Sequence, residues 1–200
     1  MSVIEGAGVL LAVSEQGDGP PVLVIHDIGR PPCTEGLAGR IITYERRGYG
    51  DSGAPEPYKA TTVHEQAEDA AAVLRQVAGE PALLVGQGFG ALVALDVAMR
   101  HRELVSGLRL VDPPLFAFVP EAAEALSTER KRLAEALRAG GPQAAVDVHL
   151  GEPSTWARDA HRAVFADLAG LASWPVTRGA LRALGPPAVV ETSPGAAAHV

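Results

Sequence analysis

The sequence predicts an α/β fold in which a mostly parallel sheet carries flanking helices and an inserted helical cap. Short runs rich in valine, isoleucine and leucine recur along the chain, and helical patterns separate them. These runs are apolar throughout, which is typical of strands covered on both faces. Strands that alternate with helices favour βαβ units and therefore a parallel sheet. Between residues 113 and 185 the alternation stops, and only helical patterns follow one another.

Six apolar runs are predicted to be strands. Their bounds are Gly8–Val13, Pro21–Ile25, Arg40–Tyr44, Pro81–Val85, Leu108–Val111 and Pro187–Val190. The link between the first two runs, residues 14–20, is rich in turn-forming residues. This link predicts an antiparallel entry into the sheet.

Two helices are predicted among the strands of the first half. Residues 62–78 place apolar side chains on one helical face, and Thr61 or Thr62 is expected to cap its start. Residues 89–99 are apolar almost all round, with Asp96 as the exception. Such a helix is expected to lie buried against the sheet.

The later helical patterns cover Glu121–Ala139, Gln143–Leu150 and Trp156–Leu171. They divide the chain into three parts. Residues 1–112 are predicted to form the α/β core, residues 113–185 a helical cap, and residues 186–200 a returning core strand with a tail.

Composition excludes several classes of function. The 200 residues hold 17 Lys and Arg against 24 Asp and Glu, a net charge of −7, with no basic stripe to bind a phosphate backbone. Only Lys59 and Lys131 are lysines, and no apolar run approaches the ~18 residues of a membrane-spanning helix. We therefore expect one domain that binds neither nucleic acid nor membrane.

The lone cysteine, Cys33, has no partner for an internal disulfide, and no Cys and His spacing resembles a zinc site. The chain start lacks the charged-then-apolar order of a secretory signal. We expect a cytoplasmic protein without metal or cofactor, in which Cys33 is a loop or core thiol.

Residues 81–96 carry the most chemical information, as a buried strand, a glycine turn and a helix. Residues 86–90 fit an elbow whose flanking glycines hold the middle residue, Gly88, over the sheet. The same stretch fits a dinucleotide fingerprint, Gly86-x-Gly88-x-x-Ala91, with Asp112 placed to bind a ribose hydroxyl. That fingerprint usually opens the first βαβ unit, whereas at least two strands and a helix precede it here. The elbow is the favoured interpretation.

Two upstream motifs accompany the elbow. His26-Asp27-Ile28-Gly29 follows the second predicted strand, and residues 44–53 hold a second glycine-rich loop after the third. With the order and spacing of elements and the helical insertion after Asp112, residues 8–193 resemble the α/β-hydrolase family. The resemblance implies hydrolysis of a small ester, lactone or similar carbonyl compound. The family uses a nucleophile on the elbow that is activated by a His, which an acid orients.

This sequence departs from the family pattern at the elbow, because Gly88 has no side chain to attack with. Asp112 ends a strand where some relatives carry the acid, although it fits a strand-end cap equally well. His199 is the late His if residues 187–191 form the last strand. If they form the seventh strand instead, which we favour, the chain stops before the catalytic His.

The backbone amides of Ile28 and Phe89 are expected to form an oxyanion hole. An ionised Asp27 beside this hole would oppose a developing oxyanion, so its side chain is expected to point away or to have a raised pKa. A turn residue that holds the loop is the alternative role for Asp27. His26 is expected to orient the loop rather than to catalyse.

These residues predict a degenerate hydrolase, either inactive or using water directly. A small-molecule binding protein and a dinucleotide-binding protein remain as alternatives. The expected ligand is a small, mostly apolar carbonyl compound. Five aromatic side chains of the cap either line its cavity or form the core of the cap: Phe116, Phe118, Trp156, Phe165 and Trp174. A shortened sheet would leave an apolar face, which predicts homodimerisation.

Overall fold

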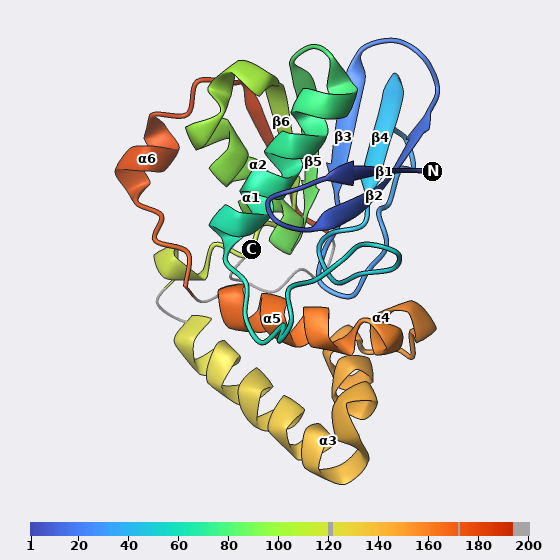
Figure 1. Cartoon of the computed structure of the whole chain (residues 1–200). Coiled ribbons are helices and arrows are strands. Elements are labelled where there is room, and N and C mark those ends of the chain that lie inside the picture. Colours follow the sequence, from blue (N-terminus) through green and yellow to red (C-terminus); the bar gives the residue numbers. More distant parts are fainter. Residues whose placement is uncertain (120–121, 172, 194–200) are drawn as a thin grey trace.

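The computed structural model describes residues 1–119, 122–171 and 173–193. Within them, seven strands form one sheet in the order β1-β2-β4-β3-β5-β6-β7 (Figure 1). The strands are β1 Ser2–Glu5, β2 Leu10–Gln16, β3 Pro21–Ile25, β4 Arg40–Tyr44, β5 Ala82–Gln87, β6 Val105–Val111 and β7 Ala188–Glu191.

The sheet is mostly parallel, as the sequence predicts. Strands β4, β3, β5, β6 and β7 run parallel to one another, and β2 pairs antiparallel with β4. The antiparallel entry is therefore confirmed. Strand β1, antiparallel to β2, was not predicted, because its four residues are largely exposed and carry no apolar run.

The site is positioned by the strand order. Strand β3 lies between β4 and β5, so the chain leaves β3 toward one side of the sheet and leaves β5 toward the other. The carboxyl ends of β3 and β5 thus flank a topological switch point, where open α/β sheets bind their ligands. His26 follows β3 directly, and Gly88 follows β5.

Helices α1 (Val63–Val73) and α2 (Phe89–Arg100) pack together on one face of the sheet (Figure 1). Thr62 caps α1: its hydroxyl accepts from the Glu65 amide at 3.0 Å, and the Glu65 carboxylate accepts from the Thr62 amide at 2.9 Å. This capping box selects Thr62 from the two predicted candidates. A π-helical turn, Leu74–Ala78, extends α1, and 3-10 turns cover Arg102–Leu104 and Phe116–Phe118.

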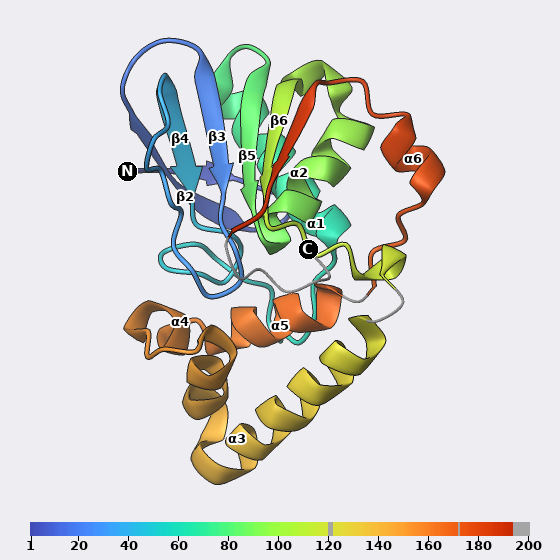
Figure 2. The same ribbon diagram turned by 180° about the vertical axis from the view of Figure 1, so that it is seen from behind.

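The opposite face of the sheet has no described helix over it, as Figure 2 shows. A small cluster of Val22, Val24 and Val85 is buried there under the partly buried Leu37 and other side chains. The strand residues on this face are thus buried without a described helix over them. Between β3 and β4 the chain, which includes Pro31 and Pro32, forms a loop rather than a helix, because proline is poorly tolerated inside helices.

The cap consists of α3 (Ala122–Leu150), α4 (Thr155–Asp159) and α5 (His161–Leu171), below the sheet in Figure 1. Gly141, with φ +76°, bends α3 just before Pro142, at the break between the two predicted helices. A short helix, α6 (Arg178–Arg182), then leads back to β7. Among the described helices, none is long and apolar enough to span a membrane.

Candidate active site

Gly88 occupies the turn between β5 and α2. Its backbone has φ +52° and ψ −119°, a conformation that non-glycine residues rarely adopt without strain. The Gly88 amide donates to the Val111 carbonyl at 2.9 Å, which fixes the turn against the end of β6. The sharp strand-to-helix elbow is therefore formed, and it carries no side chain.

The carboxyl group of Asp27 fills the space above this elbow. A Cβ atom built on Gly88 would overlap all three atoms of that carboxyl group. The Phe89 amide donates to Asp27 Oδ1 at 2.8 Å. One of the two amides expected to receive a substrate oxygen thus binds a side chain of the protein itself.

Burial raises the pKa of Asp27 above its ordinary value of 3.8. The Phe89 and Ile28 amides lower the pKa of Asp27, as do the positive charges of Arg46 and His149, but burial is the largest effect. Of the two possibilities expected for Asp27, the structure has the second: the side chain points toward the elbow, and its pKa is raised. The expectation that both amides are free for a ligand is wrong for Phe89.

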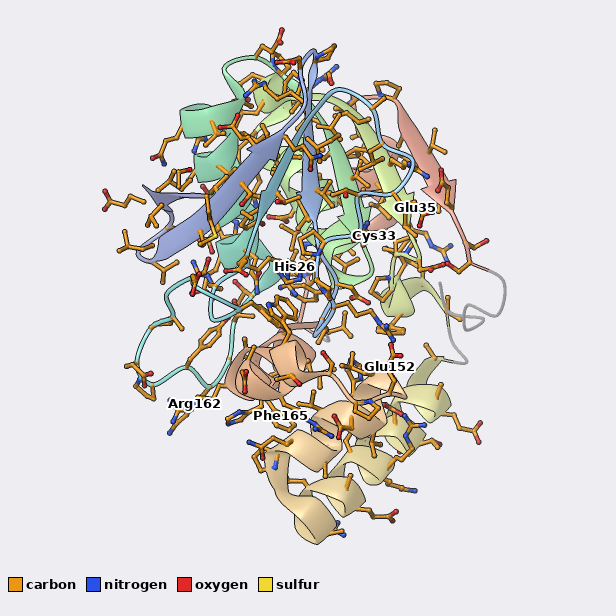
Figure 3. The ribbon with its side chains drawn as sticks, turned by 90° about the vertical axis from the view of Figure 1, so that its right-hand side faces the viewer. His26, Cys33, Glu35, Glu152, Arg162 and Phe165 are labelled. Atoms are coloured by element: carbon orange, nitrogen blue, oxygen red, sulfur yellow. The ribbon has the colours of Figure 1, made fainter. Side chains whose placement is uncertain are left out.

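His26 is fully buried between the sheet and the cap (Figure 3). Its Nε2 accepts from the Arg46 amide at 3.1 Å, so its Nδ1 carries the proton and donates to the Asp27 carbonyl at 2.8 Å. Burial, followed by the charge of Arg46, lowers the pKa of His26 well below its ordinary value. Both ring nitrogens are hydrogen-bonded to backbone groups, which fits the expected role of His26 in orienting the loop.

A pocket of about 510 Å³ opens beside the elbow. Asp27 and Gly88 line it together with side chains from β5, β6, β7 and the loop after β3. Gln87 is tied to this loop, since it accepts from the Cys33 amide at 3.1 Å and donates to the Cys33 carbonyl at 2.7 Å. Two guanidinium groups, those of Arg30 and Arg109, also line the pocket.

Asp112 lines the same pocket at the end of β6. Among the described residues it is the only one other than glycine with a positive φ, +48°. Its carboxylate accepts from the Ser193 amide at 2.7 Å and from the Ser193 hydroxyl at 2.6 Å. These bonds join the ends of β6 and β7, so the geometry favours the strand-end cap over the catalytic acid.

His199 lies outside the described residues, as does all of 194–200. The structure does place another His near the elbow, His149 on α3, which sequence reasoning missed. Its Nδ1 lies 3.6 Å from Glu129 Oε1, and its charge lowers the pKa of Asp27. No motif in the sequence marks His149, because only the folding of the cap over the core brings it there.

The five aromatic side chains separate into different surroundings. Phe116, Phe118 and Trp174 line a second cavity of about 460 Å³ between α2 and the cap. Trp156 stacks on Tyr49, with ring centroids 4.9 Å apart, and Phe165 is half-buried on α5. They therefore do not line one common cavity. No group of three metal-ligating side chains occurs within the described ranges.

A parallel sheet with a strand-turn-helix elbow, two amides beside the elbow and a helical cap defines an α/β-hydrolase fold. The sequence pattern of the alpha/beta hydrolase family matches residues 10–199, and the chain belongs to this family.

Three known proteins illustrate the relationship. Epoxide hydrolase A of Mycobacterium tuberculosis is 27% identical over 125 residues, which are 56% of this chain and 38% of that protein. The 2-(acetamidomethylene)succinate hydrolase of Mesorhizobium japonicum is 30% identical over 141 residues, 66% of this chain and 50% of that protein. The crystal structure of an alpha/beta hydrolase from Sphaerobacter thermophilus has a TM-score of 0.73 at 22% identity, covering 96% of this chain and 81% of that one. This chain spans half or less of the two curated relatives.

Proposed function

We propose that this protein hydrolyses a small, mostly apolar ester or lactone-type carbonyl compound without a covalent intermediate on the elbow. Asp27 supplies the reacting carboxylate, and it acts as a general base toward water. The observation that carries the proposal is the position of its carboxyl group, which stands in the space of the missing elbow side chain and faces a pocket of about 510 Å³.

The chemistry requires few groups. A water molecule hydrogen-bonded to the Asp27 carboxylate attacks the carbonyl carbon and gives its proton to that carboxylate. The tetrahedral intermediate then breaks its C–O bond to the alcohol, and the alcohol oxygen takes that proton from Asp27 as it leaves. A raised pKa makes Asp27 a stronger base than an ordinary aspartate, because burial favours its protonated form. Arg30 and Arg109 line the pocket and can lie near charge that develops on the substrate. Each guanidinium also keeps a carboxylate partner, Glu152 for Arg30 and Glu191 for Arg109.

The relatives support the class of reaction. Epoxide hydrolase A and 2-(acetamidomethylene)succinate hydrolase are both named as hydrolases, so addition of water is what their names share. The particular substrate is proposed from the resemblance alone.

A small-molecule binding protein is the second candidate, because Gly88 has no reactive group and both nitrogens of His26 hold backbone. A dinucleotide-binding protein is disfavoured. A pyrophosphate on Gly86-x-Gly88-x-x-Ala91 would meet the Asp27 carboxyl where the Phe89 amide now binds it. Asp112, the proposed ribose ligand, is engaged by Ser193.

The test is hydrolysis of a panel of p-nitrophenyl esters and small lactones by the wild-type protein and by Asp27→Asn. Asp18→Asn, at an exposed carboxylate in the 14–20 link, is the matched control. We expect turnover that Asp27→Asn lowers by about 100-fold or more and Asp18→Asn leaves unchanged. Reaction in H₂¹⁸O should label the product and leave the peptide containing Asp27 unlabelled. Binding of the panel compounds without turnover would select the binding protein instead.

A further inference from the structure

A fully buried ion pair joins the cap to the core beside the elbow. Asp167 of α5 accepts from Arg46 Nη2 at 2.7 Å, and neither side chain is exposed. The same carboxylate accepts from the Tyr49 hydroxyl at 2.7 Å and from Gln66 Nε2 at 2.7 Å. Each partner of Asp167 belongs to the core, so this one carboxylate collects three donors across the boundary between cap and core.

Two of these partners hold the backbone of the 26–29 loop. Arg46 Nε donates to the His26 carbonyl at 3.1 Å, and Arg46 Nη2 donates to the Asp27 carbonyl at 3.2 Å. The Tyr49 hydroxyl accepts from the Gly29 amide at 3.3 Å. The peptide groups on either side of Asp27 are therefore fixed by residues that Asp167 fixes in turn.

The neighbouring residue Arg47 forms a second buried ion pair, which serves as a comparison for the first. Asp69 accepts from Arg47 at 2.7 and 3.0 Å and from the Ala7 amide at 2.8 Å. Both side chains of this pair are nearly as buried as those of Arg46 and Asp167. The hydrogen bonds of Arg47 and Asp69 reach residue 7 and not the 26–29 loop. Of these two buried pairs, the one made by Asp167 connects a cap helix to the site.

We propose that Asp167 is a positioning residue through which the docked cap holds the Asp27 carboxyl group over Gly88. This inference rests on the proposed function for its kinetic part and on the geometry alone for its structural part. Burying two charges costs desolvation free energy, which their attraction offsets only where the geometry and the remaining hydrogen bonds are good. A buried ion pair is therefore weak evidence for stability, and a role in positioning is the better account of this one.

The expected consequence of losing Asp167 follows from the contacts. The guanidinium of Arg46 loses its carboxylate partner and can turn away from the His26 and Asp27 carbonyls. The His26 and Asp27 carbonyls then lose the donors that Arg46 supplies, although His26 Nδ1 still donates to the Asp27 carbonyl. With the loop less firmly held, the Asp27 carboxyl group drifts from the Phe89 amide. A displacement of about 1 Å at a reacting group can lower turnover by about 100-fold.

The test compares Asp167→Asn with Asp69→Asn, which removes the matched buried charge away from the site. The first readout is the ¹H and ¹⁵N chemical shift of the Phe89 amide, which needs no turnover. The second is kcat and KM for an ester that the wild-type protein hydrolyses. Asp167→Asn should shift the Phe89 amide and lower kcat by about tenfold to 100-fold with little change in KM. Asp69→Asn should lower the melting temperature without moving either readout.

Equal behaviour of the two variants, with the Phe89 amide unmoved, would overturn the proposal. If Asp167→Asn does not fold, Tyr49→Phe removes one hydroxyl that bridges Asp167 to the Gly29 amide, and it should shift the Phe89 amide in the same sense. An unmoved amide in Tyr49→Phe would then overturn it. A shifted amide in a protein without esterase activity would support the positioning role and contradict the proposed function.

Discussion

The carboxyl group of Asp27 lies where the side chain of any other residue at position 88 would begin. A side chain at position 88 and the Asp27 carboxyl group cannot occupy this space together. The present placement of the carboxyl group therefore requires a glycine on the elbow. The Phe89 amide, 2.8 Å from Asp27 Oδ1, fixes that arrangement at the start of α2. The elbow therefore keeps its shape while the carboxyl group above it comes from the loop after β3.

A serine at position 88 alone should not restore a conventional active site. In Gly88→Ser the new Cβ overlaps the Asp27 carboxyl, which adds about 1–3 kcal/mol of overpacking to the backbone strain. Gly36→Ser is the matched control, because Gly36 also has a positive φ, +71°, but no atom lies near its Cβ position. Urea unfolding should show a clearly larger loss for Gly88→Ser, and equal losses would contradict the overlap.

Removing the charge of Asp27 should remove a cost to the stability of the fold that grows as the pH rises. The folded-state pKa of Asp27 is raised above its ordinary value of 3.8, so between the two values the folded protein binds more protons than the unfolded chain. This group therefore costs stability as the pH rises through that window, and Asp27→Asn has no such cost.

The difference in the free energy of unfolding, Asp27→Asn minus wild type, should be larger at pH ~7 than at pH ~3. Urea titrations at both values measure it. Asp18→Asn controls for the loss of a carboxylate, since Asp18 is exposed. A difference that falls with pH would show that the pKa of Asp27 is lowered rather than raised.

His149 should tune the titration of Asp27 from the cap. The positive charge of His149 lowers the pKa of Asp27, so His149→Gln should move the midpoint of Asp27 to higher pH. His161→Gln is the control, because His161 is also a cap histidine and its Nδ1 contacts the Arg158 carbonyl at 3.0 Å. The pH dependence of the Phe89 amide shift reports the midpoint, and equal midpoints in both variants would rule out this influence.

Asp112 should behave as a link between β6 and β7. Asp112→Asn keeps a side chain that tolerates a positive φ but weakens the bonds to Ser193, so we expect a loss of about 1 kcal/mol. Ser193→Ala should cost a similar amount, and both variants should change turnover by the same small factor. A steep fall in turnover for Asp112→Asn alone would identify Asp112 as a catalytic acid.

Much of the fold can be read from local patterns. Strand β3 is buried at every residue, and its uniformly apolar sequence predicts this burial. Strand β1 could not be found in this way, because Ser2–Glu5 gains its place by pairing with β2 at an exposed edge. Strand composition reports that both faces are buried, but not that a loop rather than a helix covers the second face.

The site was predictable only in part. The glycine turn marks the elbow, and the His26-Asp27-Ile28-Gly29 motif marks the neighbouring loop. The direction of the Asp27 side chain depends on the backbone at Gly88 and on Arg46, which binds the Asp27 carbonyl from the other side. The contributions of Asp167 and His149 arise from long-range docking of the cap, for which a single sequence carries no signal.

The most direct test of the account is a double-mutant cycle between positions 27 and 88. The free energies of unfolding are measured for Gly88→Ser, for Asp27→Ala and for the variant that combines them. If the Asp27 carboxyl occupies the space above Gly88, the combined variant should be at least about 1 kcal/mol more stable than the sum of the single losses implies. Additive losses would show that the two residues do not share that space and would contradict the account.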